Sequence, residues 1–365
     1  MANRADVIKP DERRGRGART NAAGRFEAHA KARLDDGWGT VEEVGPSAQT
    51  TVTAEAVRKI ITRNQSPDIP FDRSVNPYRG CEHGCIYCYA RPSHAYMGLS
   101  PGLDFETRLF AKPDAAARLA AEIARPGYRC APLAFGTNTD PYQPIERQWR
   151  LMRQCLDVLA QADHPVSITT KSHLVTRDLD LLAPMAAKGL VNVSLSVTTL
   201  DHRLARALEP RASTPRRRLA AVQALATAGV PTGVMVSPVI PALTDHEIEA
   251  ILAAAAQAGA VEAGWILLRL PLEVKDLFQE WLADEAPERA GRIMSQIRAA
   301  RGGRENDPRF HERFKGSGAA AEMIAQRFAR ARRAHGLERD DRPGLRTDLF
   351  RPPTGDCNQF DLFDG

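Results

Sequence analysis

Long apolar runs and a rich supply of cysteine are both missing from this sequence. No stretch approaches the roughly 18 consecutive apolar residues that a membrane-spanning helix requires, and the polar start lacks the apolar centre of a secretory signal. The sequence therefore predicts a cytoplasmic protein with no membrane partner. Six cysteines in 365 residues are too few for a disulfide framework. No self-similarity appears at the periods typical of solenoid proteins.

The charge balance is only mildly positive. The formal net charge is +5 at pH 7, and 43% of the residues are hydrophobic, which is ample for a sizeable core. A small positive excess permits an anionic partner such as nucleic acid but does not demand one. It is equally typical of an arginine-rich proteome.

Short β-branched runs alternate with longer Ala/Leu-rich stretches from about residue 70 onward. Strands separated by crossovers of helical length predict a parallel α/β sheet. Six such units are too few to close a full TIM barrel but suit a partial (β/α)6 TIM-type barrel. Periodicity alone leaves a flat doubly wound sheet as the alternative. The expected strands are 74–78, 133–136, 166–170, 191–197, 232–236 and 265–270.

Helical spacing of apolar residues fills the intervals between these strands. Thr214 and Thr244 are expected to be N-caps, and Gly189, Gly229 and Gly259 are expected to end the preceding helices. The expected helices are 113–125, 146–162, 176–188, 214–228, 244–258, 272–300 and 318–335.

Composition divides the chain into four parts. Residues 1–69 are expected to form a basic, partly disordered N-terminal arm, and residues 70–271 the partial barrel. Residues 272–340 are expected to form a helical C-terminal extension. The last part, 341–365, is rich in proline and glycine and predicts a flexible tail that carries a short linear motif.

Three cysteines lie within eight residues at the spacing C-x3-C-x2-C. In a cytosolic protein this spacing indicates metal or cluster ligation by Cys81, Cys85 and Cys88. Three thiolates leave one iron of a 4Fe–4S cluster without a protein ligand, and an open position is where a small molecule binds and reacts. The alternatives are a zinc site completed by His83 or His94, and three unligated cysteines.

The surrounding sequence resembles a known family. The stretch 76–91, NPYRGCEHGCIYCYAR, resembles the cluster loop of the radical S-adenosylmethionine (radical SAM) superfamily, and the segments 15–18 and 24–27 extend the similarity. The resemblance is to the spore photoproduct lyase branch, and more closely to an uncharacterised bacterial family within it. It implies a partial (β/α)6 barrel, a 4Fe–4S cluster and S-adenosylmethionine as cofactors, and a flavodoxin- or ferredoxin-type reductant. The implied reaction is cleavage of S-adenosylmethionine to a 5′-deoxyadenosyl radical, which abstracts hydrogen from a substrate.

The resemblance implies that polar residues at the strand ends contact the cofactor. The loop after the second expected strand occupies the position that contacts the amino group of S-adenosylmethionine in related enzymes. A lysine after the third strand and an arginine after the fourth would pair with its carboxylate, and two serines of the fourth strand would meet the ribose. The expected contacts are Thr137, Asn138, Thr139, Asp140, Lys171, Ser194, Ser196 and Arg211.

Several strand-end residues keep two interpretations. Glu146 either adds an acceptor to the pocket or begins the next helix favourably. Arg269, between leucines, either faces an anionic substrate or forms an ion pair at the rim. Spore photoproduct lyase carries a hydrogen-donating cysteine after its second strand, but this sequence has none there. Cys155 is expected in the core of a helix and Cys130 at the opposite end of the barrel.

The C-terminal residues suggest a partner. Gln359–Phe363 resembles the pentapeptide by which bacterial repair and replication proteins bind the DNA sliding clamp. With the arginine-rich stretch 327–333, it makes nucleic acid the leading substrate class. The alternatives are a tail that covers the protein's own barrel, and a non-enzymatic iron–sulfur or zinc protein that acts as a docking module.

Overall fold

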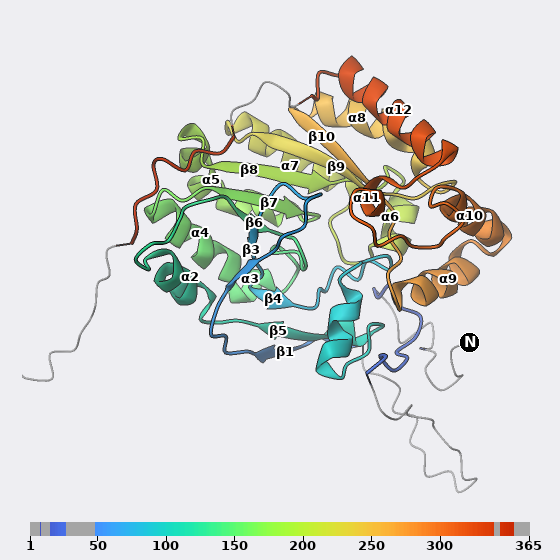
Figure 1. The fold of residues 1–365 in the computed structure, drawn as a ribbon, viewed down its shortest axis with the longest axis horizontal. Helices are drawn as coiled ribbons and strands as arrows, with labels where there is room; N and C mark the ends of the chain where they lie inside the picture. Colours follow the sequence, from blue (N-terminus) through green and yellow to red (C-terminus); the bar gives the residue numbers. More distant parts are fainter. Residues whose placement is uncertain (1–7, 9–14, 27–47, 339–343, 354–365) are drawn as a thin grey trace, which may run out of the picture.

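A seven-stranded sheet lies at the centre of the molecule (Figure 1). The computed structural model describes residues 8, 15–26, 48–338 and 344–353. The strand order is β10-β9-β8-β7-β6-β3-β2, in which the pairs from β3 to β10 are parallel and β2 is antiparallel to β3. The bounds are β2 Ile61–Arg63, β3 Arg73–Val75, β6 Leu133–Phe135, β7 Val166–Thr170, β8 Val191–Ser196, β9 Thr232–Val239 and β10 Glu262–Leu267.

Alternation along the strands separates a helix-covered face from an inner face. In β8, Val191, Val193 and Leu195 belong to the main core, while Ser194 lies on the other face and is half-buried. Helices between successive strands cover the core face (Figure 1). They are α2 Ala115–Ile123, α3 Glu146–Trp149, α4 Leu151–Gln161, α5 Leu179–Ala187, α7 Pro215–Thr227 and α8 Ile248–Gln257, with the short helices η3 His173–Asp178, α6 His202–Leu208 and η4 Asp245–Glu247.

The predicted parallel α/β fold is confirmed, with six parallel strands in sequence order and open edges at β10 and β2. The first expected strand differs, because it divides at Pro77 into β3 and β4 (Tyr78–Arg79). Proline has no N–H to donate to a ladder. β4 instead joins a second sheet of order β1-β5-β4, with β1 at Thr51–Ala54 and β5 at Arg108–Ala111.

Two strands precede residue 70, in the segment expected to be an arm. β2 pairs with β3 in the large sheet, and β1 pairs with β5 in the small one. Their side chains are exposed or half-buried. Edge strands of this kind have no buried alternation, so the hydrophobic pattern does not reveal them.

The helix ends agree only in part with the expected caps. The Thr214 hydroxyl accepts a hydrogen bond from the Arg217 amide and caps α7, as predicted. Thr244 occupies the N-cap position of η4, as predicted, but its hydroxyl does not cap this helix and accepts from the Ile240 amide at 2.9 Å instead. Pro287 starts a new helix and divides the expected helix 272–300. The helix-ending glycines have positive φ as expected: Gly189 72°, Gly229 77° and Gly259 90°.

The C-terminal helices lie beside α8 and β10 and beyond the carboxyl ends of the strands, on the right of Figure 1. They are α9 Val274–Glu285, α10 Pro287–Ala299, α11 Glu312–Lys315 and α12 Ala319–Ala334. A second core joins α9 and α10 to the cysteine-containing loop through Phe278, Trp281 and Ile86. Part of the expected flexible tail lies on the body, where the Arg351 amide donates to the Ala162 carbonyl at 2.9 Å.

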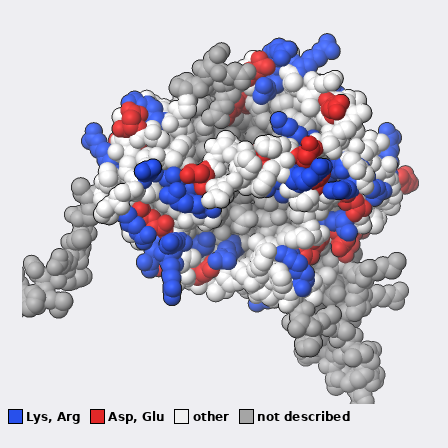
Figure 2. Space-filling model, in the orientation of Figure 1, with Lys and Arg blue, Asp and Glu red and all other residues white. Residues whose placement is uncertain are grey.

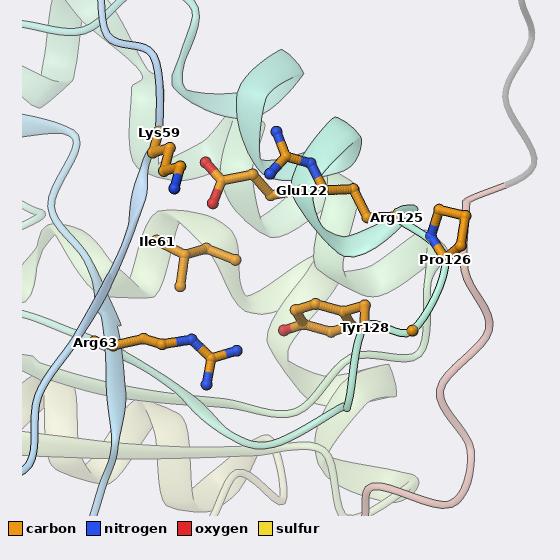
Figure 3. Close-up of a pocket in the computed structure, with 8 residues that line it drawn as sticks. Lys59, Ile61, Arg63, Glu122, Arg125, Pro126 and Tyr128 are labelled. Carbon is orange, nitrogen blue, oxygen red and sulfur yellow. The ribbon is translucent and has the colours of Figure 1, made fainter.

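Two further features concern the surface. None of the described helices is long and apolar enough to cross a bilayer. A pocket of about 460 Å³ lies between β2 and α2, where Lys59, Arg63, Arg125 and Glu122 meet beside Tyr128 (Figure 3). The Glu122 carboxylate accepts a hydrogen bond from the Ile60 amide there. None of the three clustered cysteines lines this pocket.

Candidate active site

The three clustered cysteines lie on one loop, residues 80–90, which we call the cysteine loop. It starts at Gly80, whose φ is 73° and where a Cβ would lie 2.6 Å from Leu109. The Cys81 amide donates to the Phe105 carbonyl at 3.0 Å and the Ile86 amide to the Leu208 carbonyl at 3.0 Å. The loop thus follows β4 of the small sheet and is held by the Phe105 segment on one side and by the end of α6 on the other.

The chemistry of the loop fits a metal cluster. Cys81 and Cys85 are buried, Cys88 is half-buried, and all three thiols are free. Burial raises the pKa of each thiol, so without a metal they remain protonated and unreactive. Iron supplies the positive charge that turns buried thiols into thiolate ligands. Within the described ranges, no three His, Cys, Asp or Glu side chains are placed so that together they could hold a metal ion.

Arg91 binds the backbone of the cysteine loop. It is fully buried and donates to the carbonyls of Cys85 at 2.9 Å and Gly84 at 3.2 Å. The same guanidinium pairs with the Glu106 carboxylate at 2.5 Å, from the short helix α1 (Asp104–Thr107). Arg91 begins the 3-10 helix η2 (Arg91–Met97). The sequence motif includes Arg91 but does not predict this role, which depends on Glu106.

An N-terminal segment, residues 15–26, crosses under the same loop, and we call it the strap. The amides of Gly17 and Ala18 donate to the Glu106 carboxylate at 2.9 and 2.8 Å. A Cβ on Gly17 would lie 1.9 Å from the Gly84 carbonyl oxygen, so the two backbones are in direct contact. The strap therefore supports the loop that carries the cysteines.

A buried acid lies behind the cysteine loop. Glu209 accepts hydrogen bonds from Tyr87 and Thr198 and pairs with Arg218. Burial raises the pKa of the Glu209 carboxyl, but Arg218 and Lys171 outweigh it and lower the pKa to about 2. This charged network fixes Tyr87, the residue before Cys88. Sequence reasoning did not find it, because nothing in the local sequence pairs Glu209 with Arg218.

The structure brings Asp140 and Lys171, both expected at the cofactor, against the cysteine loop. Asp140 accepts from the Lys171 amide at 2.7 Å, from the Thr170 hydroxyl at 2.6 Å and lies 3.3 Å from the His83 ring. Burial raises the pKa of Asp140, but His83 and these donors lower it to about 2. The Lys171 ammonium lies 5.8 Å from the Tyr87 ring centre. Asp140 is thus a charged link between two strand ends and the loop.

The three residues before Asp140 are arranged around Asn76. Its side-chain oxygen accepts from the amides of Asn138 and Thr139, and its nitrogen donates to the Thr137 hydroxyl at 3.3 Å. The Thr139 hydroxyl is buried and donates to the Tyr78 carbonyl at 3.1 Å. Asn76 thus shapes this loop, another role that sequence reasoning missed.

The remaining expected contacts lie on two neighbouring elements. Ser194 and Ser196 share the inner face of β8, with Ser196 buried and Ser194 half-buried. The Arg211 guanidinium is partly exposed and pairs with Glu82, next to Cys81, at 3.0 Å. The backbone amide of Arg211 donates to the His83 carbonyl. Of the expected cofactor contacts, Asp140, Lys171 and Arg211 therefore contact the cysteine loop, and the roles of all eight toward the cofactor stay predictions.

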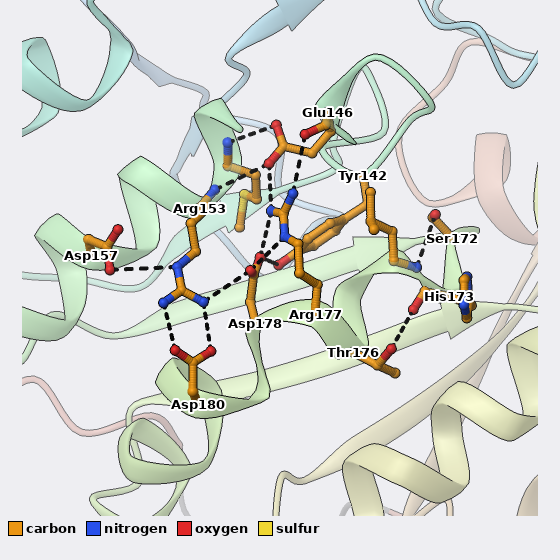
Figure 4. Close-up of polar contacts among 12 residues, drawn as sticks. Tyr142, Glu146, Arg153, Asp157, Ser172, His173, Thr176, Arg177, Asp178 and Asp180 are labelled. Atoms are coloured by element: carbon orange, nitrogen blue, oxygen red, sulfur yellow. Dashed lines mark hydrogen bonds and ion pairs between the residues drawn. The ribbon is translucent and has the colours of Figure 1, made fainter. Parts of the chain in front are cut away.

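Glu146 lies in a separate ion network. Its carboxylate accepts from the Met152 amide at 3.1 Å and pairs with Arg177 at 2.7 Å (Figure 4). Arg177 also pairs with the buried Asp178, to which the Tyr142 hydroxyl donates. Of the two interpretations of Glu146, the start of a helix agrees with the structure, because α3 begins at this residue and its carboxylate is bound in this network.

The two candidate zinc-binding histidines have other partners. His83 contacts Asp140, while the His94 ring contacts the Arg108 carbonyl at 3.0 Å and packs edge-on against Phe105. Burial lowers the pKa of His94 to about 4. Cys155 is in the main core, as expected, and Cys130 is half-buried before β6. Cys357 lies outside the described residues.

A parallel α/β sheet with a C-x3-C-x2-C loop at its carboxyl edge defines the radical S-adenosylmethionine class of enzymes. The family profile described as the Radical SAM superfamily matches residues 75–255, from the end of β3 into α8. The chain belongs to the radical SAM superfamily, whose members use a 4Fe–4S cluster and S-adenosylmethionine, and it is a radical SAM enzyme.

The chain is also similar to individual proteins. An uncharacterized protein of Mycobacterium bovis is 41% identical over 232 residues, which are 63% of this chain and 68% of that protein. An uncharacterized protein of Methanocaldococcus jannaschii is 27% identical over 173 residues, 47% of this chain and 62% of that one. A structure of a spore photoproduct lyase variant has the same fold, with a TM-score of 0.57 over 80% of this chain and 81% of that one, at 16% identity.

Proposed function

We propose that the chain cleaves S-adenosylmethionine reductively at the cysteine loop and abstracts a hydrogen atom from a substrate at the open end of the barrel. When bound, the cluster and S-adenosylmethionine supply an electron and a 5′-deoxyadenosyl radical. The observation that carries the proposal is the contact of Asp140, Lys171 and Arg211 with the loop that holds the three free thiols, two of which are buried.

The roles proposed for the chain's own residues are those that the resemblance implies. Cys81, Cys85 and Cys88 hold the cluster, and the fourth iron position is left to the cofactor. Lys171 and Arg211 bring positive charge to the loop and pair with the carboxylate of S-adenosylmethionine. Thr137, Asn138, Ser194 and Ser196 line its amino and ribose groups, while Thr139 and Asp140 hold the loops in place.

The test is anaerobic reconstitution followed by dithionite and S-adenosylmethionine. The wild-type protein is expected to hold about four irons per chain and to release 5′-deoxyadenosine. Cys88→Ser is expected to lose both. Cys130→Ser is the matched control, because this half-buried cysteine lies before β6, and it should behave as wild type. A fully loaded wild-type cluster without 5′-deoxyadenosine release would refute the proposal.

Nucleic acid, a flavodoxin- or ferredoxin-type reductant and a cytoplasmic location are proposed on the sequence arguments given above. The clamp motif, Gln359–Phe363, lies outside the described residues. Truncation after Thr354 tests it: binding of the purified DNA sliding clamp should be lost, while iron content and S-adenosylmethionine cleavage are retained. Clamp binding that survives the truncation would contradict the role of this motif, and no binding by the full chain would remove the clamp as a partner.

A further inference from the structure

Arginines and aromatic rings alternate just beyond the carboxyl end of β10. The Arg269 guanidinium lies 5.5 Å from the Tyr89 ring centre and 5.1 Å from the Phe314 ring centre. Arg313 lies 4.6 Å from Phe314 and 4.9 Å from Phe310. We call these five residues the arginine–aromatic row. It joins the residue after Cys88 to the loop before α11.

The row runs from the cysteine loop to the surface. Tyr89 is 47% exposed and Phe310 is 50% exposed, while Phe314 is half-buried between them. Lys and Arg side chains gather with acidic groups over the region of α11 (Figure 2). A ligand lying along the row would therefore reach from solvent to the site where the cofactor is expected.

Arg269 contacts two rings in the row, but its Nε has no hydrogen-bond acceptor. This atom is buried, while the residue as a whole is half-buried, and no partner for Nε is present in the part of the chain that the structure describes. Burial and the nearby Arg313 lower the pKa of Arg269. A buried donor without an acceptor is costly, and an anionic ligand that reaches Nε would relieve that cost.

The neighbouring arginines, Arg313 and Arg301, already bind acceptors of the protein. Arg313 pairs with Asp68 through two hydrogen bonds of 2.7 and 2.5 Å. Arg301, which is buried, donates to the carbonyls of Leu267 and Leu268 at the end of β10 and adds positive charge behind Arg269. Arg313 is therefore neutralised by Asp68, whereas no carboxylate of the described residues pairs directly with Arg269 or Arg301.

We propose that the arginine–aromatic row binds a single-stranded nucleic acid, with a phosphate on Arg269 and bases on Tyr89, Phe314 and Phe310. This inference rests on the proposed function, because it names the substrate class of the same site. Nucleic acid alternates anionic phosphates with flat rings, as the row alternates cations with rings. Stacking of bases on aromatic side chains beside arginines is typical of single-strand binding.

Fluorescence anisotropy of the reconstituted holoenzyme tests the row with a labelled single-stranded DNA or RNA 12-mer. Phe310→Ala is expected to weaken binding by at least about fivefold, because one stacked base is lost. Arg269→Gln should weaken binding and reduce the slope of log K against log salt by about 0.7, the loss of one phosphate contact. The matched control is Phe26→Ala, since Phe26 is also an exposed ring beside an arginine, Arg25 at 4.6 Å.

Competitors identify the ligand chemistry. Adenosine monophosphate and the ringless polyanion polyglutamate should compete far more weakly than the 12-mer. The proposal that the row binds nucleic acid would be refuted if adenosine monophosphate or polyglutamate competed as well as the 12-mer. It would also be refuted if Phe310→Ala and Arg269→Gln both kept their iron and bound the 12-mer with wild-type affinity. If wild-type protein binds the 12-mer but does not cleave S-adenosylmethionine, only the proposed function fails. If it cleaves the cofactor but does not bind the 12-mer, only the row fails.

Discussion

Arg91 and Glu106 form an ion pair whose two side chains are both fully buried. Arg91 also donates to the carbonyls of Pro101 and Gly102, so one guanidinium serves several acceptors at once. A lysine has a compact ammonium on a flexible stem and cannot satisfy the same set. The position of the cysteine loop therefore depends on an arginine in particular.

Arg91→Lys is expected to lower the free energy of unfolding by about 2 kcal/mol, because buried carbonyls lose their donors. The iron content after reconstitution should fall with it. Chemical denaturation and an iron assay measure the two effects. Arg108→Lys is the control, since the Arg108 side chain is 56% exposed. Equal stability and iron content in the Arg91 variant and wild type would contradict this role.

His164 predicts a pH dependence of stability. Its ring is buried between the Tyr128 hydroxyl and Phe350, and burial, with Arg73, lowers its pKa to about 4. The unfolded imidazole titrates near about 6.5. Between these values the unfolded chain binds more protons, so stability is lost as the pH falls from about 6.5 to 4.

The expected size of this loss is about 2 to 3 kcal/mol at pH 4.5. Urea unfolding at pH 7.5 and 4.5 measures it in wild type and in His164→Gln. The wild type should lose more stability than the variant by that amount, because carboxylates contribute equally to both proteins. The same loss in both would show that His164 is not held neutral.

At the scale of elements, the strap tests how closely the chain packs under the cysteine loop. Gly17→Ala is expected to lower iron content and to destabilise the protein by about 2 kcal/mol or more, because backbone must move to admit the Cβ. Gly291→Ala in α10 is the control. Its Cβ would meet no atom within 4 Å, so it should be neutral or slightly stabilising. Thermal unfolding and iron analysis separate the two, and an unaffected Gly17 variant would contradict the packing.

Elements with strong local periodicity were predictable. The strands β7 and β8 and the helix α7 lie where the apolar pattern placed them, and α7 has the expected cap. The expected helix 146–162 is present in two parts, α3 and α4, which are divided at Arg150, where φ is 52°. Elements whose existence depends on distant partners were not predicted. β1 has mostly exposed residues and forms only because β5 lies beside it.

At the scale of the whole molecule, segments far apart in sequence enclose the cysteine loop. The strap joins it to α9 through Arg25 and Glu273, at 2.8 Å, and through the pair of Arg19 and Asp284. The second core packs α9 against the same loop. The spacing of the cysteines predicted the cluster site, but these long-range supports involve charged residues that are common on any surface.

The candidate site divides in the same way. Its cysteines and strand-end residues come from local motifs, and the structure gathers them around one loop. Asn76, Arg91 and the pair of Glu209 with Arg218 act by contacts that only the folded chain creates. Common residue types at irregular spacing carry no signal before folding.

The most direct test of the central claim is electron paramagnetic resonance of the dithionite-reduced holoenzyme with and without S-adenosylmethionine. The three cysteines leave one iron open, so S-adenosylmethionine should bind there and change the spectrum of the reduced cluster. Cys130→Ser should give the same change, and Cys88→Ser should lack the signal. A complete cluster whose spectrum is unaltered by saturating S-adenosylmethionine would contradict the account.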